Sequence, residues 1–176
     1  MVKVIDNFIS QSESDKLRDF MMSGQMPWFF NTGILDATDA TDGIEFYKKD
    51  PGEKDYQFTH QFYRNYGFVS ELSHILNPIL EKLGAASLIK IKANLSPGTE
   101  KNIEGGYHQD YDFKCKTAVY YVNTNNGYTK FNNEEKIESV QNRFVEFDSF
   151  TDHTGATCTD QKSRVVINFN YFVKDI

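Results

Sequence analysis

No stretch of the 176-residue chain approaches the roughly 18 consecutive apolar residues of a transmembrane helix, so we expect no membrane span. The first residues, MVKVIDNFIS, lack the long apolar run of a secretory signal, and the cytoplasm is therefore the expected location. Basic residues are in the minority, with 19 Lys and Arg against 25 Asp and Glu, and they form no basic run. Nucleic acid is accordingly not an expected partner.

Cysteine is also scarce, since the chain has only Cys115 and Cys158. Two cysteines cannot make a disulfide framework, and their spacing matches no CxxC zinc or redox pattern. We therefore expect two reduced thiols in a reducing compartment. The bias toward Asn, Lys, Phe and Tyr is compatible with an AT-rich genome such as that of a bacteriophage, in which case the location would be the host cytoplasm.

Apolar and aromatic side chains are abundant, at 39 % and 15 % of the residues, which is enough for the core of a single domain over residues 1–176. Residues 1–85 are expected to supply supporting helices and edge strands. The predicted elements there are a strand over 2–9, a helix over 12–22 that begins with the capping-box spacing Ser10–Glu13, a strand over 56–65 and an amphipathic helix over 69–83. Asn77-Pro78 is expected to kink or split the last helix.

Residues 36–56 differ from their surroundings because they contain seven acidic residues and three lysines, a net charge of −4. Gly, Pro and Asp are frequent in this segment, and its apolar residues show no period. The composition is typical of a long exposed loop, and we expect it to act as a lid over a functional site.

From residue 86 to residue 172 the apolar pattern has a period of two, which predicts a series of short strands. The segments that carry the pattern are SLIKIKANLS, KTAVYYVN, YTKF, NRFVEF and RVVINFNYF. Asn126-Gly127 predicts a two-residue hairpin before YTKF. Early helices followed by many short strands predict a mainly β fold with supporting α-helices, a sandwich or barrel.

Four histidines are present, and two of them are expected to be structural or surface residues, His60 in a strand and His74 on the polar side of a helix. His108 differs, because His108 and Asp110 are two residues apart in an extended segment and so point to the same face. His153 follows the predicted strand NRFVEF. Two histidines and one aspartate from separate segments match the facial triad of non-haem Fe(II) oxygenases, which leaves three coordination positions open.

Arg164 opens the last predicted strand. Strand alternation places four side chains on one face of it: Arg164, Val166, Asn168 and Asn170. One interpretation is a rim arginine paired with Asp160 or Glu146. The other is a fixed fork that binds the far carboxylate of a dicarboxylate cosubstrate, and the triad upstream favours it.

Together these motifs resemble the Fe(II)/2-oxoglutarate-dependent dioxygenase superfamily, in its prolyl 4-hydroxylase-like branch. Their order and spacing match over residues 86–172, whereas the first 85 residues match only in kind, through VKVIDNFISQSES. The matching pieces, in chain order, are His108-Gln-Asp110, TAVYYVN, NGYTKF, NRFVEFDS, His153 and Arg164-Val-Val-Ile-Asn-Phe.

The resemblance implies a double-stranded β-helix, a jelly-roll or cupin-like barrel, with iron at His108, Asp110 and His153. It also implies that Arg164 anchors the cosubstrate 2-oxoglutarate, that O₂ is consumed and that ascorbate is a candidate stimulant. Tyr121 matches a tyrosine that contacts the cosubstrate in many relatives, and the alternative is an inward-facing core tyrosine.

Two positions depart from the pattern of prolyl hydroxylases. Ser96 stands where many carry a tyrosine before Pro-Gly, and Asn170 stands where many carry an inward tryptophan. Asn94 and Asn168 are candidates for polar lining of the pocket, or for buried structural amides. Iron and 2-oxoglutarate remain compatible with these changes, but a prolyl substrate does not follow automatically.

The expected function is hydroxylation of an unactivated C–H bond, first of all in a peptidyl proline, with 2-oxoglutarate converted to succinate and CO₂. A peptide or protein is the expected partner. The alternatives are an oxygenase for a small molecule or free amino acid, a non-catalytic jelly-roll module that binds carbohydrate or protein, and a cupin-like isomerase or metal-binding protein without 2-oxoglutarate.

Overall fold

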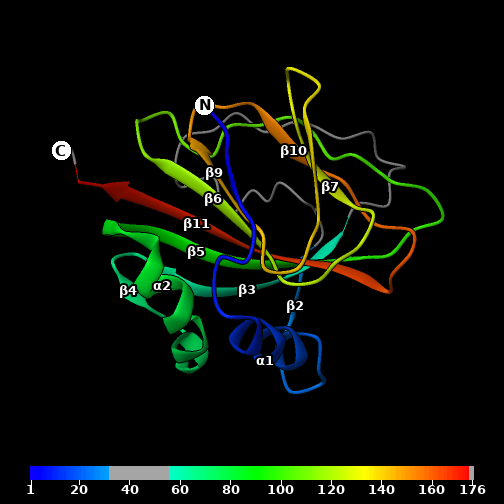
Figure 1. Ribbon diagram of the computed structural model, residues 1–176, viewed down its shortest axis with the longest axis horizontal. Coiled ribbons are helices and arrows are strands. Elements are labelled where there is room, and N and C mark those ends of the chain that lie inside the picture. Colours follow the sequence, from blue (N-terminus) through cyan, green and yellow to red (C-terminus); the bar gives the residue numbers. More distant parts are fainter. Residues whose placement is uncertain (32–55, 175–176) are drawn as a thin grey trace.

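The protein contains two antiparallel sheets that face each other (Figure 1). The computed structural model describes residues 1–31 and 56–174. Within these residues the larger, major sheet has eight strands in the order β1-β9-β6-β11-β5-β3-β2, with β4 beside β3. Its strands are β1 (Lys3–Ile5), β2 (Phe29–Asn31), β3 (Gln57–Arg64), β4 (Gly67–Phe68), β5 (Ala85–Pro97), β6 (Lys116–Tyr121), β9 (Phe144–Asp148) and β11 (Ser163–Val173).

A smaller, minor sheet covers one face of the major sheet (Figure 1). Its order is β10-β7-β8, and its strands are β7 (Tyr128–Phe131), β8 (Lys136–Glu138) and β10 (His153–Gly155). This mainly β architecture with few helices confirms the predicted fold class.

The helices lie against the opposite face of the major sheet (Figure 1). Helix α1 (Gln11–Met21) begins with the predicted capping box, in which Ser10 Oγ accepts the Glu13 N–H and the Glu13 carboxylate accepts the Ser10 N–H. None of the helices formed by the described residues is long and apolar enough to cross a bilayer.

The amphipathic segment predicted as a helix over 69–83 is split in two. A 3-10 helix, η2 (Glu71–Leu76), leads directly into α2 (Asn77–Leu83), with Pro78 in the first turn of α2. Proline has no N–H to continue the preceding turn, so the split occurs where Asn77-Pro78 predicts it. Gly84 ends α2 in the left-handed region, with φ of 65°.

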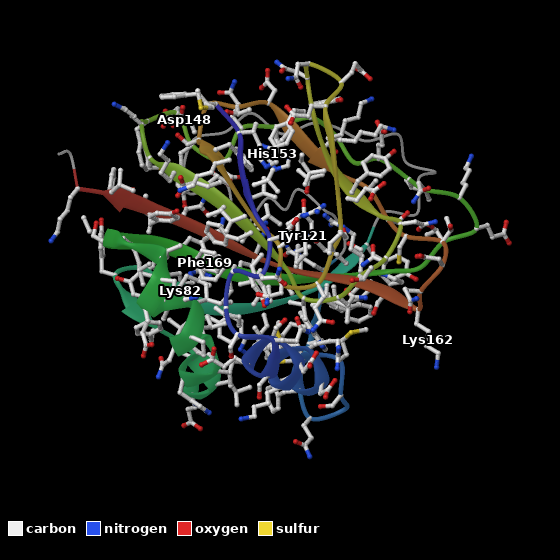
Figure 2. The ribbon with its side chains drawn as sticks, viewed as in Figure 1. Lys82, Tyr121, Asp148, His153, Lys162 and Phe169 are labelled. Carbon is white, nitrogen blue, oxygen red and sulfur yellow. The ribbon has the colours of Figure 1, made fainter. Side chains whose placement is uncertain are left out.

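Strand β11 lies near the middle of the major sheet, and its two faces differ in character. The odd-numbered side chains pack toward the helices in the main core: Val165, Ile167, Phe169 and Tyr171. Figure 2 shows Phe169 on this helix side of the sheet. The opposite face carries Arg164 and Asn168, so the predicted alternation of β11 is confirmed.

The hairpin predicted at Asn126-Gly127 is wrong, because β6 and β7 lie in different sheets. A tight hairpin of this kind needs positive φ at both turn residues, and neither residue has it. Instead Asn126 lies where the chain passes from the major sheet to the minor sheet. It bonds the segment before β11: its N–H donates to Asp160 and its side-chain amide donates to Thr159. Strand β7 pairs with β8 and β10.

Apart from Tyr56, the acidic segment 36–56 lies outside the described residues, so its role as a lid stays a prediction. The histidines outside the predicted triad have local partners. The ring of buried His60 contacts the Pro27 carbonyl and the Ser70 hydroxyl, each at 2.8 Å, and exposed His74 contacts the Glu71 carbonyl. Cys115 and Cys158 are buried free thiols.

Candidate metal centre and cosubstrate cavity

The two candidate histidine ligands are held side by side by backbone pairing. His108 and His153 form an isolated antiparallel bridge in which each N–H donates to the other's carbonyl at 3.0 Å. Their ring centroids are 4.5 Å apart. The sequence separates these residues widely, and the bridge explains how the segment before β6 meets the first residue of β10.

The nitrogen atoms that face the candidate site are the Nε2 atoms. Nδ1 of His108 lies 3.2 Å from the Gly106 carbonyl, and Nδ1 of His153 lies 2.9 Å from the Thr151 carbonyl. A carbonyl can only accept, so each Nδ1 carries a proton and Nε2 is the nitrogen that remains to bind a metal ion. Both Nε2 atoms approach Oδ1 of Asp110, at 3.7 and 3.8 Å.

The second carboxylate oxygen of Asp110 is fixed by two hydrogen bonds. Oδ2 accepts hydrogen bonds from Thr117 Oγ1 at 2.8 Å and from Asn170 Nδ2 at 2.7 Å. Asn170 was a candidate for pocket lining, and the structure places it on the carboxylate instead. These two hydrogen bonds leave Oδ1 as the oxygen available to a metal ion.

Protonation of the site also suits a metal ion. Burial lowers the pKa of His108 to about 4, with a further contribution from neighbouring His153, so the His108 ring is neutral at pH 7. Burial would raise the pKa of Asp110, but the two imidazoles and the hydrogen bonds from Asn170 and Thr117 outweigh it and lower that pKa to about 2. The carboxylate is therefore ionised at pH 7.

His108, Asp110 and His153, the triad, each offer one ligand atom, and these atoms lie within 4.8 Å of one another. Two imidazole nitrogens and one carboxylate oxygen, each on a side chain whose other polar atom is already hydrogen-bonded, are the donors that a 2-His-1-carboxylate iron site uses. The residues present thus fit an Fe(II) ion, with coordination positions left for other ligands.

Arg164 is almost fully buried, with 6 % of its surface exposed, and its hydrogen bonds go to neutral groups. Nε donates to Ser139 Oγ at 2.8 Å, and Nη2 donates to Thr129 Oγ1 at 3.2 Å. The guanidinium lies over the ring of Tyr121, 5.5 Å from its centroid. A buried cation of this kind is costly without an anion.

The structure offers no carboxylate partner for Arg164 among residues 1–31 and 56–174. Asp160 accepts the Asn126 N–H, and Glu146 accepts the Tyr171 hydroxyl. The interpretation of Arg164 as a rim arginine paired with one of these acids therefore loses its support. A buried, unneutralised guanidinium fits an anionic ligand instead.

One cavity of about 90 Å³ connects the two ends of the candidate site. Its walls include His108 and His153 at one end and Arg164 and Thr129 at the other. The full lining is Gln57, Asn94, Ser96, Ile103, His108, Val119, Thr129, His153, Gly155, Ala156, Thr157, Arg164, Val166 and Asn168. A ligand could thus reach the triad and the guanidinium at once.

Tyr121 is fully buried between the sheets and does not line the cavity (Figure 2). Its hydroxyl donates to Thr129 Oγ1 at 2.7 Å, and Thr129 does line the cavity. The predicted contact of Tyr121 with a cosubstrate stays a prediction, while the core position is what the structure describes. Of the predicted lining residues, Asn94 and Asn168 do face the cavity.

Sequence reasoning missed three hydroxyls that support the charged groups: Thr117 on Asp110, and Thr129 and Ser139 on Arg164. Thr129 had a detectable signal, because it alternates with the half-buried residues Tyr128 and Lys130 in YTKF and so faces inward. Ser139 lies just beyond a three-residue strand, and the sequence gives no signal that it faces inward.

Gly127 is expected to be required for this packing, so replacing it with alanine should destabilise the protein by about 1–3 kcal/mol. A Cβ there would lie 2.6 Å from Arg164 Cδ, 2.8 Å from Asn125 Oδ1 and 2.9 Å from the Ala156 carbonyl oxygen. Urea unfolding measures the effect. Gly24→Ala is the matched control, because a Cβ there meets no atom within 4 Å. Equal midpoints for both variants would contradict the close approach.

Solved structures of two hydroxylases share this fold. A prolyl hydroxylase from Trichoplax adhaerens, in complex with a hypoxia inducible factor oxygen degradation domain peptide fragment, aligns over 97 % of this chain and 83 % of its own, with a TM-score of 0.57 and 18 % identity. A prolyl-4-hydroxylase from Pseudomonas putida aligns over 99 % of this chain and 93 % of its own, with a TM-score of 0.52 and 12 % identity. No protein-family model and no curated protein matches the chain. The likeness confirms, at the level of the fold, the resemblance to prolyl 4-hydroxylases.

Proposed function

We propose that the protein is an Fe(II)- and 2-oxoglutarate-dependent oxygenase that hydroxylates a C–H bond of its substrate. The observation that carries the proposal is a cavity lined by the two histidines of the triad and by a buried guanidinium that has no carboxylate partner among the described residues. The fold shared with two prolyl hydroxylases supports the same activity.

In this proposal the triad binds Fe(II) through the two Nε2 atoms and Asp110 Oδ1. Held there together with 2-oxoglutarate, the ion would supply the O₂ chemistry that couples oxidative decarboxylation of the cosubstrate, to succinate and CO₂, with hydroxylation of the substrate. The protein contributes orientation: Thr117 and Asn170 fix the carboxylate, and the backbone bridge between His108 and His153 fixes the rings.

Arg164 would bind the far carboxylate of 2-oxoglutarate, and Thr129 would assist it. Both lone pairs of Thr129 Oγ1 are used, since it accepts from Arg164 Nη2 and from the Tyr121 hydroxyl. Its own proton is therefore free to be donated into the cavity. Guanidinium and hydroxyl together provide two kinds of donor for one carboxylate, and Tyr121 acts as a positioning residue.

For the substrate, the shared fold supports a peptide, because the Trichoplax adhaerens enzyme was solved with a peptide fragment. Peptidyl proline is the first substrate to test, with hydroxylation as the proposed reaction and ascorbate as an additive. A cytoplasmic location remains a prediction.

The test is anaerobic titration of the purified protein with Fe(II) and 2-oxoglutarate, followed by measurement of succinate after O₂ is admitted. We expect a 2-oxoglutarate-dependent rise in melting temperature and succinate formation that requires Fe(II). A cupin-like metal protein would bind the ion without any response to 2-oxoglutarate, and a jelly-roll binding module would respond to neither. Either result would overturn the proposal.

A further inference from the structure

Two amide oxygens in the wall of the cavity have no hydrogen-bond donor. The Oδ1 atoms of Asn94 and Asn168 are buried from solvent and unpaired, and both residues line the cavity together with the two histidines of the triad. Oε1 of Gln61 is a third buried oxygen without a donor. Among the side chains that the structure describes, these three atoms are the buried nitrogen and oxygen atoms that lack a partner.

Strand register brings the three acceptors into one patch. Strand β5 pairs with β3 on one side and β11 on the other, and Lys92 of β5 stands opposite both Gln61 and Asn168. Asn94, two residues along β5, points to the same face. Directly opposite and diagonal positions in a sheet are close enough for long side chains to meet. The acceptors therefore share one polar wall on the inner face of the major sheet.

Elsewhere the protein satisfies its buried amides, so this exception calls for a ligand. Asn142 bonds both the N–H and the carbonyl of Ile9, and Asn123 bonds the backbone of Ser163 and Val165. A buried acceptor without a donor lowers stability, and proteins keep such atoms chiefly where something else binds.

The proposed cosubstrate cannot supply the missing donors. At neutral pH 2-oxoglutarate has two carboxylates and a keto oxygen, all of them acceptors, and it draws on Arg164 and Thr129 instead. The substrate is the other ligand of the proposed reaction, and it can carry such donors. The cavity lining contains no Asp or Glu among the described residues, so a cationic donor would meet no counter-charge there. A proline in a peptide has no N–H to offer.

We infer that the group hydroxylated by this protein carries a neutral N–H or O–H donor beside the reacting carbon, a carboxamide or a hydroxyl rather than a proline ring. The inference rests on the proposed oxygenase function and replaces peptidyl proline, the first substrate to test there, with a substrate of this kind. Ser96 agrees with it, because this small polar residue also lines the cavity. Asn94 and Asn168 act as specificity residues that accept the substrate's protons.

Three small probes of the same shape test the inference: acetamide, propan-2-ol and acetone. The first carries amide donors, the second a hydroxyl donor, and the third only an acceptor. The protein is loaded with Mn(II) and 2-oxoglutarate, and the paramagnetic broadening of each probe's methyl protons reports its occupancy near the metal. We expect acetamide or propan-2-ol to be broadened about tenfold more than acetone, since an acceptor left without a donor disfavours binding by a factor of about that size. The stronger of the two identifies the donor as amide or hydroxyl.

Asn94→Leu and Asn168→Leu should remove this preference, while Asn133→Leu, at an exposed position, should keep it. Both cavity variants should unfold at or above the melting temperature of the parent protein, because they delete an unpaired acceptor. Equal broadening by all three probes, or a preference that survives both variants, would overturn the inference alone. Failure of Mn(II) or 2-oxoglutarate to bind, which is titrated first, would instead overturn the proposed function and with it the inference.

Discussion

Asp110→Ala should weaken Fe(II) binding by more than about 100-fold, a larger loss than the roughly 10- to 100-fold that follows removal of a group supporting a metal ligand. The carboxylate is the triad's only anion, and its Oδ1 lies within 4 Å of both histidine Nε2 atoms. Without it, only the two imidazoles of the triad remain. Anaerobic calorimetric titration with Fe(II), repeated with Co(II), measures the change.

Two further variants calibrate this result. Asn170→Leu removes one of the two hydrogen bonds to Asp110 Oδ2 and should cost the smaller, 10- to 100-fold factor. Asp148→Ala removes an exposed carboxylate that pairs with Lys116 and should leave Fe(II) affinity unchanged. Full affinity in Asp110→Ala would show that the metal binds elsewhere in the protein.

Arg164→Met should weaken 2-oxoglutarate binding by about 2–5 kcal/mol while changing the stability of the cosubstrate-free protein far less. The expected separation has a physical cause. Methionine fills much of the same space and removes a buried charge that no described carboxylate neutralises, and such a replacement is often neutral or stabilising. The remaining cost is the loss of the hydrogen bonds to Ser139 and Thr129.

Chemical unfolding without cosubstrate, and melting temperature against 2-oxoglutarate concentration, measure the two effects separately. Arg164→Lys keeps the positive charge but loses the paired donors of the planar guanidinium. Its affinity for 2-oxoglutarate should therefore lie between those of the parent protein and Arg164→Met. If Arg164→Met unfolded the protein readily and left cosubstrate affinity intact in the folded fraction, the arginine would be structural.

The residues of β11 were predictable because alternation depends only on position along the strand. Arg164 and Asn168 share a face wherever the strand pairs, so the sequence indicated which side chains would point into the cavity. The His108 and Asp110 pair was visible for the same reason. Its meeting with His153 was inferred from the match of two histidines and one aspartate to a facial triad, and then from the family resemblance, since spacing alone does not bring segments about 45 residues apart together.

Features that depend on register and on crossings between sheets were not predictable. Asn170 was expected to line a pocket, but the register of β11 against β6 sets it opposite Thr117, where both bond Asp110. At Asn126-Gly127 the local preference for a tight hairpin was overridden, because β7 pairs in the minor sheet and Gly127 is needed for the close approach of Arg164.

The two faces of β11 also have a consequence for how readily new specificities could be selected. The side chains that hold the major sheet to the helices, such as Ile167 and Phe169, alternate with those that face the cavity, such as Asn168. Mutations at Asn94 or Asn168 therefore leave the main core untouched, and a library randomised at these positions should yield mostly folded variants. Under the inference that Asn94 and Asn168 contact the substrate, substrate preference and thermodynamic stability would thus depend on alternate residues and could be varied separately.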